Sequence, residues 1–100
     1  MSIAQTRGGY PDVFRDTIDS TGRPHAFKFT SQYLILRSAA QVKMFFTEAD
    51  FDAGVNYVQV EPPGVNHTTG EWQGPVEVDT VWLKATTTAA VELVAIMRRG

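Results

Sequence analysis

The sequence predicts an all-β domain: an antiparallel β-sandwich or jelly roll of about seven strands, preceded by an extended N-terminal arm. Two observations carry this prediction. From residue 25 onward, short runs of β-branched and aromatic residues are separated by turn signals roughly every 8 to 12 residues, as in sandwiches. The composition, 43% hydrophobic and 20% charged, is that of a folded protein, and 100 residues give room for one core.

The expected strands are short, and most of them alternate in polarity. They cover residues 25–29, 32–37, 41–46, 55–60, 76–79, 80–85 and 90–97. Residues 32–37 are apolar on both faces, which favours a central strand. Residues 88–98 contain good helix formers, but the apolar positions 91, 93, 95 and 97 recur with a period of two, which favours a strand.

Residues 1–23 differ from the rest of the chain. They contain Gly8, Gly9, Pro11 and Gly22 among polar residues, with only scattered apolar positions. We expect an extended arm with one weak helical turn at about residues 12–19. Because such an arm has no core of its own, it must dock on its own domain or on a neighbouring subunit. The predicted organisation is therefore an arm over residues 1–23 and a β-sandwich domain over residues 24–100.

Composition argues against several classes of function. Nine Lys and Arg residues against eleven Asp and Glu give a net charge of −2, which does not favour a nucleic-acid binder. The absence of cysteine excludes disulfides and thiolate metal sites. No secretory signal is visible, and no apolar run approaches the roughly 20 residues that span a bilayer. We expect a soluble protein that is made in the cytoplasm and binds neither nucleic acid nor membrane.

Motifs for catalysis or metal binding are missing. The acidic segment 48–54 resembles the start of a calcium loop, but the required Gly and bidentate Glu are absent from their positions. We expect a solvated turn there, with Phe51 directed inward. His25 and His67 form no metal-ligand pattern and are expected on the surface or in loops. With no nucleophile motif either, we expect no catalytic residue, no metal site, no cofactor and no enzymatic activity.

Aromatic side chains are the remaining candidates for binding. Trp82 lies between Val81 and Leu83, on a strand expected to be buried on both faces, so we expect it in the core. Trp72 lies at the edge of a polar loop and is a candidate interface residue. Two or more exposed aromatics on one concave face would instead suit sugar binding.

The layout as a whole carries a resemblance to a known class. Its features are the polar Gly-rich start, the paired segments 33–37 and 42–46, the segment 80–85 after a long loop, and an apolar strand ending at residues 98–100. Over roughly residues 25–98 this pattern resembles the small β-sandwich virion proteins of tailed phages, including capsid decoration or cement proteins. The resemblance implies a structural protein on the capsid surface that binds the major capsid protein or another virion protein. It also implies a homo-oligomer, with a trimer favoured.

The resemblance further implies which residues bind the partner. Arg7, Arg15 and Arg23 would pair with an acidic capsid surface, and Tyr10 and Phe14 would be apolar anchors in the arm. Trp72 completes the predicted partner-binding set. Two alternatives stay open: a carbohydrate-binding sandwich module on a receptor-binding fibre, and a head-completion or tail component.

Overall fold

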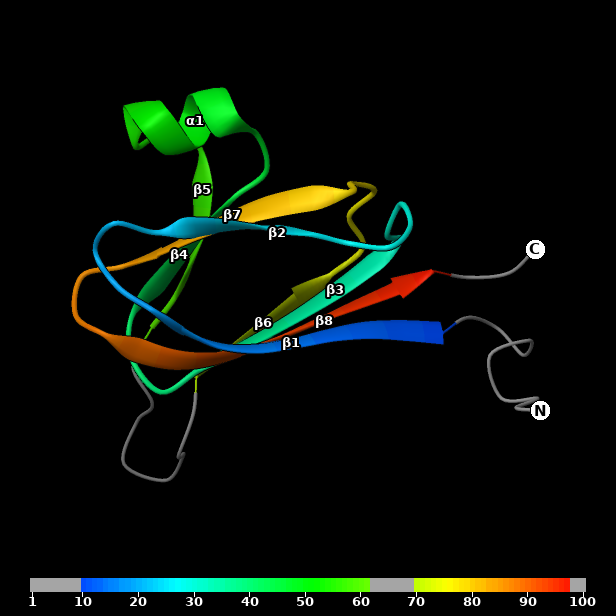
Figure 1. Cartoon of the computed structure of the whole chain (residues 1–100), viewed down its shortest axis with the longest axis horizontal. Coiled ribbons are helices and arrows are strands. Elements are labelled where there is room, and N and C mark those ends of the chain that lie inside the picture. Colours follow the sequence, from blue (N-terminus) through cyan, green and yellow to red (C-terminus); the bar gives the residue numbers. More distant parts are fainter. Residues whose placement is uncertain (1–9, 62–69, 98–100) are drawn as a thin grey trace.

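The structure, a computed structural model, describes residues 10–61 and 70–97. In these residues two four-stranded antiparallel sheets face each other, and one short helix lies outside them (Figure 1). The elements are β1 (Tyr10–Ile18), β2 (Arg23–Ala26), β3 (Tyr33–Ser38), β4 (Val42–Phe45), α1 (Glu48–Ala53), β5 (Tyr57–Val60), β6 (Gly70–Gly74), β7 (Thr80–Ala85) and β8 (Ala89–Met97). The predicted all-β sandwich is confirmed, with eight strands. No helix in the described ranges is long and apolar enough to cross a membrane.

The strand pairing is that of a jelly roll. Sheet A has the order β1-β8-β3-β6, and sheet B has the order β2-β7-β4-β5. The antiparallel pairs β1·β8, β2·β7, β3·β6 and β4·β5 join strands counted inward from the two ends of the chain. This is the pattern of one long hairpin rolled into two sheets. As predicted for residues 32–37, β3 is a central strand, between β8 and β6.

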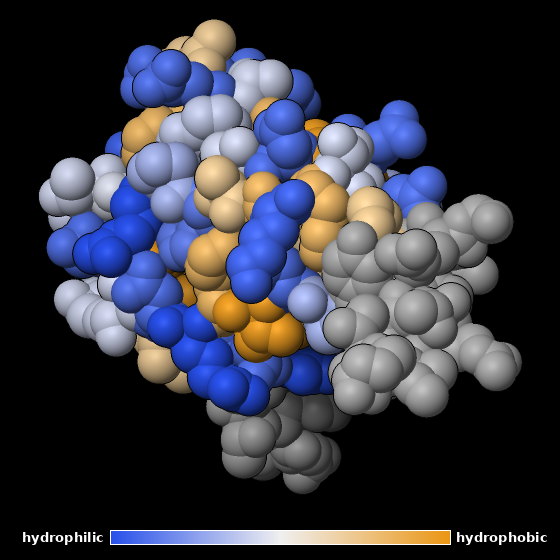
Figure 2. All heavy atoms as spheres, turned by 45° about the vertical axis from the view of Figure 1, so that its right-hand side comes forward, coloured by the Kyte–Doolittle hydropathy of each residue, from blue (hydrophilic) through white to orange (hydrophobic). Residues whose placement is uncertain are grey.

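The core lies between the inner faces of the two sheets, because buried and less buried residues alternate along the strands. The fully buried large side chains include Leu34, Leu36 and Leu93 from sheet A, and Val42, Met44, Val81 and Leu83 from sheet B. Burying one such side chain stabilises the fold by about 1.5–3 kcal/mol. Hydrophobic residues are not confined to the interior: Figure 2 shows several gathered in the middle of one largely hydrophilic face.

β1 corrects the predicted division into arm and sandwich. All nine of its residues pair with β8, so residues 10–18 belong to the sandwich and the helical turn expected at residues 12–19 is wrong. Alternation decides this: Phe14 and Ile18 face inward, whereas Val13 and Arg15 face solvent. β1 lies beside the long, strongly apolar strand β8 and gains a full ladder of backbone hydrogen bonds from this pairing. The composition of β1 alone does not indicate such a ladder. Residues 1–9 of the predicted arm lie outside the described residues.

α1 corrects the turn that the sequence predicted at residues 48–54. The Thr47 side chain accepts a hydrogen bond from the Asp50 N–H at its start, and Gly54 ends it with φ +71°. Phe51 does point inward, as expected: its ring packs edge-on against Phe45, with centroids 5.5 Å apart. Gly22 lies beneath this ring. α1 therefore covers part of the outer face of sheet B.

Two further predictions change. Trp82 is half-buried on the outer face of sheet B, so its predicted place in the core is wrong; its neighbours Val81 and Leu83 face inward. The strand expected at residues 76–79 is absent, and β6 lies just before it, paired with β3. Residues 76–78 instead cross between the sheets, held by the buried Ser31: its Oγ donates to the Val76 carbonyl and its N–H donates to the Val78 carbonyl, at 2.7 Å each.

Candidate functional site

The register of sheet A aligns four charged residues, one from each strand, in a single row. Arg15 of β1 lies opposite Glu92 of β8, Glu92 lies opposite Arg37 of β3, and Arg37 lies opposite Glu71 of β6. Their neighbours in each strand, such as Leu36 and Leu93, face the core, so these four side chains face outward. We call Arg15, Glu92, Arg37 and Glu71 the charge row; its signs alternate across the whole sheet.

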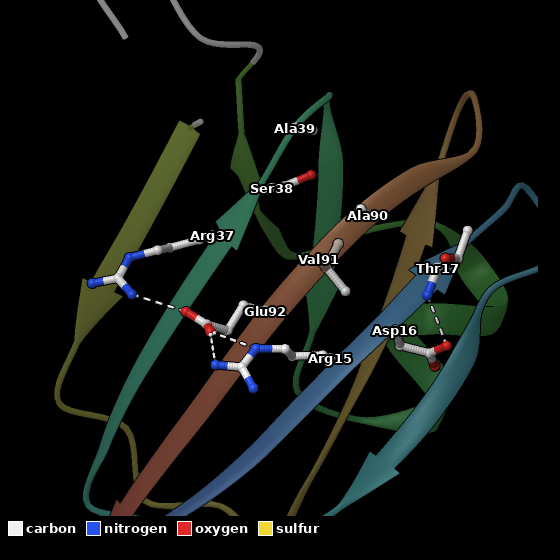
Figure 3. Close-up of a pocket in the computed structure, with 9 residues that line it drawn as sticks. All are labelled: Arg15, Asp16, Thr17, Arg37, Ser38, Ala39, Ala90, Val91 and Glu92. Carbon is white, nitrogen blue, oxygen red and sulfur yellow. Dashed lines mark hydrogen bonds and ion pairs between the residues drawn. The ribbon is translucent and has the colours of Figure 1, made fainter. Parts of the chain in front are cut away.

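The charge row is linked by hydrogen bonds. Figure 3 shows Arg15 and Arg37 reaching from either side to the Glu92 carboxylate, with Arg15 Nε 3.0 Å from Oε2 and Arg37 Nη1 2.9 Å from Oε1. Arg37 Nε lies 3.5 Å from Glu71 Oε2. The hydrogen bond from Arg37 lowers the pKa of Glu92, and Arg15 adds to this effect against the cost of desolvation. Glu92 is therefore ionised at neutral pH.

Apolar residues form the next two rows of the same face. Val13, Val94 and Ile35 lie opposite one another on β1, β8 and β3, and Pro11, Ile96 and Tyr33 follow them. The six side chains are exposed to different extents, and Val13 is 44% exposed. We call these six residues the apolar rows. β-Branched residues on the outer face of a sheet keep contiguous apolar area in water, which is the property of a contact surface.

A shallow hollow of about 600 Å³ lies on the other side of the charge row (Figure 3). Small side chains leave this space open: Thr17, Ala39 and Ala90 lie along it, and the two arginines of the charge row border it. Arg15 is paired with Glu92, and Arg37 is paired with both Glu92 and Glu71, so two carboxylates neutralise the two guanidinium groups. The hollow therefore has no unneutralised cation to bind an anion.

A second polar cluster closes the edge of the sandwich between β1 and β2. His25 Nε2 and Arg23 Nη1 each lie 3.2 Å from Asp16 Oδ2, and Phe14 packs edge-on against the His25 ring. Burial raises the pKa of Asp16, but the Thr17 N–H, His25 and Arg23 together lower it further than burial raises it. The Asp16 carboxylate thus joins the edges of the two sheets.

The Asp16–His25 pair is the one arrangement in the described residues that resembles part of a general-base site. His25 is 5% exposed, so its predicted place on the surface is wrong, while His67 lies outside the described residues. Nε2 of His25 contacts Asp16, and Nδ1 of His25 has no hydrogen-bond partner in the structure. A general base needs a nitrogen within reach of a nucleophile or substrate. The pair is placed to hold the sheet edges together.

The structure distributes the predicted partner-binding residues over different places. Phe14 and Arg23 come together with Asp16 at the edge of the sandwich, and Arg15 belongs to the charge row. Trp72 points inward, half-buried against the core and against Phe46. Arg7 lies outside the described residues, and Tyr10 begins β1 without a described side chain. Among the members of this set whose side chains are described, Arg15 is the one that lies on the face with the apolar rows.

Sequence reasoning missed the apolar rows, although a signal for them was present. Residues 32–37 and 90–97 have apolar side chains at both odd and even positions, so each strand is apolar on both faces. Such a strand is either covered on both faces or leaves one apolar face exposed. Because sheet A has no described element over its outer face, the second apolar set of these strands faces solvent. The register then adds Val13 and Pro11 of β1 to it.

The outer face of sheet B carries a different set of side chains. Tyr57, Phe45 and Trp82 lie opposite one another in adjacent strands, with Phe45 buried beneath α1. Lys43 Nζ lies 4.7 Å from the centre of the Tyr57 ring. Tyr57, 37% exposed, is the one described aromatic residue that is exposed, so the paired exposed aromatics expected of a sugar site are not present among the described residues.

Comparison with known proteins gives no family for the chain: no protein-family model, curated protein or solved structure matches it. Within residues 10–61 and 70–97, no three His, Asp or Glu side chains are grouped so as to hold a metal ion. The outer face of sheet A, with the charge row and the apolar rows, is therefore the candidate functional site.

Proposed function

We propose that this chain is a non-catalytic structural protein that binds other protein subunits on a phage capsid, as a decoration or cement protein does. One observation carries the proposal: the apolar rows remain partly exposed on the outer face of sheet A, with Pro11 and Val13 exposed and the other four side chains half-buried, and a paired charge row borders them. Apolar area rimmed by polar residues is the usual composition of a protein contact surface.

The fold supports this proposal as an analogy. Eight-stranded jelly rolls are found in viral capsid proteins and also in lectins and cupins, so the fold alone leaves several functions open. The outer face of sheet A separates them, because a contact made by Val13, Val94 and Ile35 suits another protein better than it suits a hydrated sugar. Tyr57 is the residue on which a carbohydrate site would depend instead.

Cosedimentation tests the proposal. Purified full-length protein is added to expanded capsids assembled from the major capsid protein of the same genome. We expect saturable binding that Val94→Lys weakens, because lysine interrupts the centre of the apolar rows. Val55→Lys is the matched control, since Val55 is 50% exposed between α1 and β5, away from sheet A. If the full-length protein does not bind capsids, or binds tails instead, the decoration role is wrong.

A deletion tests the part of the predicted arm that precedes β1. Removing residues 1–20 would remove β1 and its nine pairs with β8, so loss of binding would report unfolding. Removing residues 1–9 leaves β1 in place. If Arg7 and its neighbours bind the capsid, this shorter deletion keeps the cooperative unfolding transition and loses capsid binding. Full affinity after the deletion would exclude the arm from the contact.

A further inference from the structure

We propose that the subunit bound by the outer face of sheet A is a second copy of this chain, related by a two-fold axis. The axis lies in the plane of the contact, runs along the strands, and passes between the two central strands β8 and β3. This inference rests on the proposed function in one respect, that the face is a protein contact surface. It adds the identity of the partner and the symmetry of the contact.

The alternation of the charge row is the first argument. Across β1, β8, β3 and β6 the charges are positive, negative, positive and negative. A two-fold axis along the strands reverses this order in the second copy, so Glu92 faces Arg37 of the second copy and Arg15 faces its Glu71. Every charge then meets an opposite charge. A row that is antisymmetric about its centre is complementary to itself under this operation.

Other symmetries lose this match. A two-fold axis that runs across the strands, along the row, places each charge of the row against the same charge of the second copy, and like charges in a contact are unfavourable. A trimer of the kind implied by the resemblance uses heterologous contacts, in which one patch meets a different patch. The self-complementarity of the charge row therefore favours a pair over a three-fold ring.

The apolar rows fit the same operation. With the axis between β8 and β3, Val94 of one copy faces Ile35 of the other, and Ile96 faces Tyr33 in the next row. Stacked sheets of the aligned class cross at about 30°, so the pairs nearest the axis fit best, and these are the apolar ones and Glu92 with Arg37. Val13, at the edge strand β1, meets Gln73 of the second copy nearer the rim.

The area of the face sets the strength of the contact. Four strands about 4.8 Å apart and three rows of residues give roughly 400 Å² per copy, or about 800 Å² for the pair. This is half the size of a standard stable interface, so the pair is weak and reversible in dilute solution. Two copies bound at neighbouring sites of a lattice would meet at an effective concentration on the order of millimolar, where even a weak pair forms. Such pairing would link adjacent capsid sites.

Charge inversion provides a specific test. The fourfold variant Arg15→Glu, Glu92→Arg, Arg37→Glu and Glu71→Arg keeps every ion pair within the sheet and every pair across the two-fold axis. It reverses the pairing only between one inverted and one wild-type chain, where all four contacts become like-charged. In sedimentation equilibrium between about 1 μM and about 500 μM, we expect each protein to self-associate as its concentration rises. When the two proteins are mixed, we expect mixed pairs to be depleted by about tenfold or more relative to the statistical level. Mixed pairs at the statistical level overturn the proposed symmetry.

A single substitution keeps the proposal testable if the fourfold variant does not fold. Val94→Lys should weaken self-association about tenfold or more, because it places an unpaired charge at the centre of the contact. Val55→Lys should not change it. A chain that stays monomeric at the highest concentration, or forms a trimer, overturns the inference. If a monomer binds capsids, the proposed function holds and the proposed dimer is wrong. If a dimer forms but binds no capsid, the dimer holds and the proposed decoration role is wrong.

Discussion

The contact between Gly22 and the helix α1 provides the sharpest test of the fold. Gly22 has φ +77°, and a Cβ atom built on it would lie 2.7 Å from the Leu83 carbonyl oxygen and 2.7 Å from the Phe51 ring. Both approaches are far inside van der Waals contact, and the backbone oxygen belongs to a central strand of sheet B. Gly22→Ala therefore has to widen the gap to both the Leu83 carbonyl of β7 and the Phe51 ring of α1.

The magnitude follows from two contributions. An alanine in the left-handed region costs about 1 kcal/mol relative to glycine, and overpacking a well-packed site costs about 1–3 kcal/mol more. We expect Gly22→Ala to lower the free energy of unfolding by about 2–4 kcal/mol, a large part of the stability of a domain of this size. Gly54→Ala is the matched control. It has φ +71° with nothing within 4 Å of the added Cβ, so only the backbone cost of about 1 kcal/mol applies.

Urea unfolding followed by tryptophan fluorescence measures both variants under the same conditions. Phe51→Ala in the Gly22→Ala background should recover part of the loss, because it removes one of the two obstructing groups. If Gly22→Ala costs no more than Gly54→Ala, the close packing of α1 on sheet B is refuted.

Three further predictions concern pH, the helix cap and the core. The pKa values of Glu92 and Asp16 are lowered in the folded protein, so their stabilisation is present above their ordinary values of 4.5 and 3.8 and is lost as the pH falls through the lowered values. Urea titrations between neutral and acid pH should show wild type and Glu92→Gln converging below about pH 4; a constant offset would contradict the charge row. Thr47→Ala should lower stability by about 1 kcal/mol through loss of the cap of α1, and Thr47→Ser should restore most of it. Leu93→Ala should cost about 2–5 kcal/mol in the same assay, against less than about 0.5 kcal/mol for Val13→Ala on the outer face.

The six-residue helix α1 shows why local signals were only partly informative. Its cap residue Thr47 and its terminal Gly54 are both visible in the sequence, but six residues are too few for a helical period to stand out. β6 is similar, because Gly70–Gly74 has one large apolar residue, Trp72, and no alternation that would indicate a strand. These residues form a strand because they pair with β3.

Predictions about individual aromatic and histidine side chains depended on which face of a sheet each residue occupies. Trp82 was expected in the core and His25 on the surface, but Trp82 lies on the outer face of sheet B and His25 lies on the inner one. A shift of one residue in the alternation reverses inside and outside. Neighbouring apolar residues on both sides, as around Trp82, give no information about that choice.

The sequence by itself determined the fold class, the central position of β3 and a strand at residues 90–97, which is β8 in the structure, since period-two patterns and turn residues act locally. Tertiary structure decided that residues 10–18 join the sandwich, because their pairing partner lies some 80 residues away along the chain. It also decided the charge row. Arg15, Arg37, Glu71 and Glu92 are scattered over the chain, and only the register of four strands places them side by side with alternating sign. Register is a property of pairs of strands, and a single strand carries no record of it.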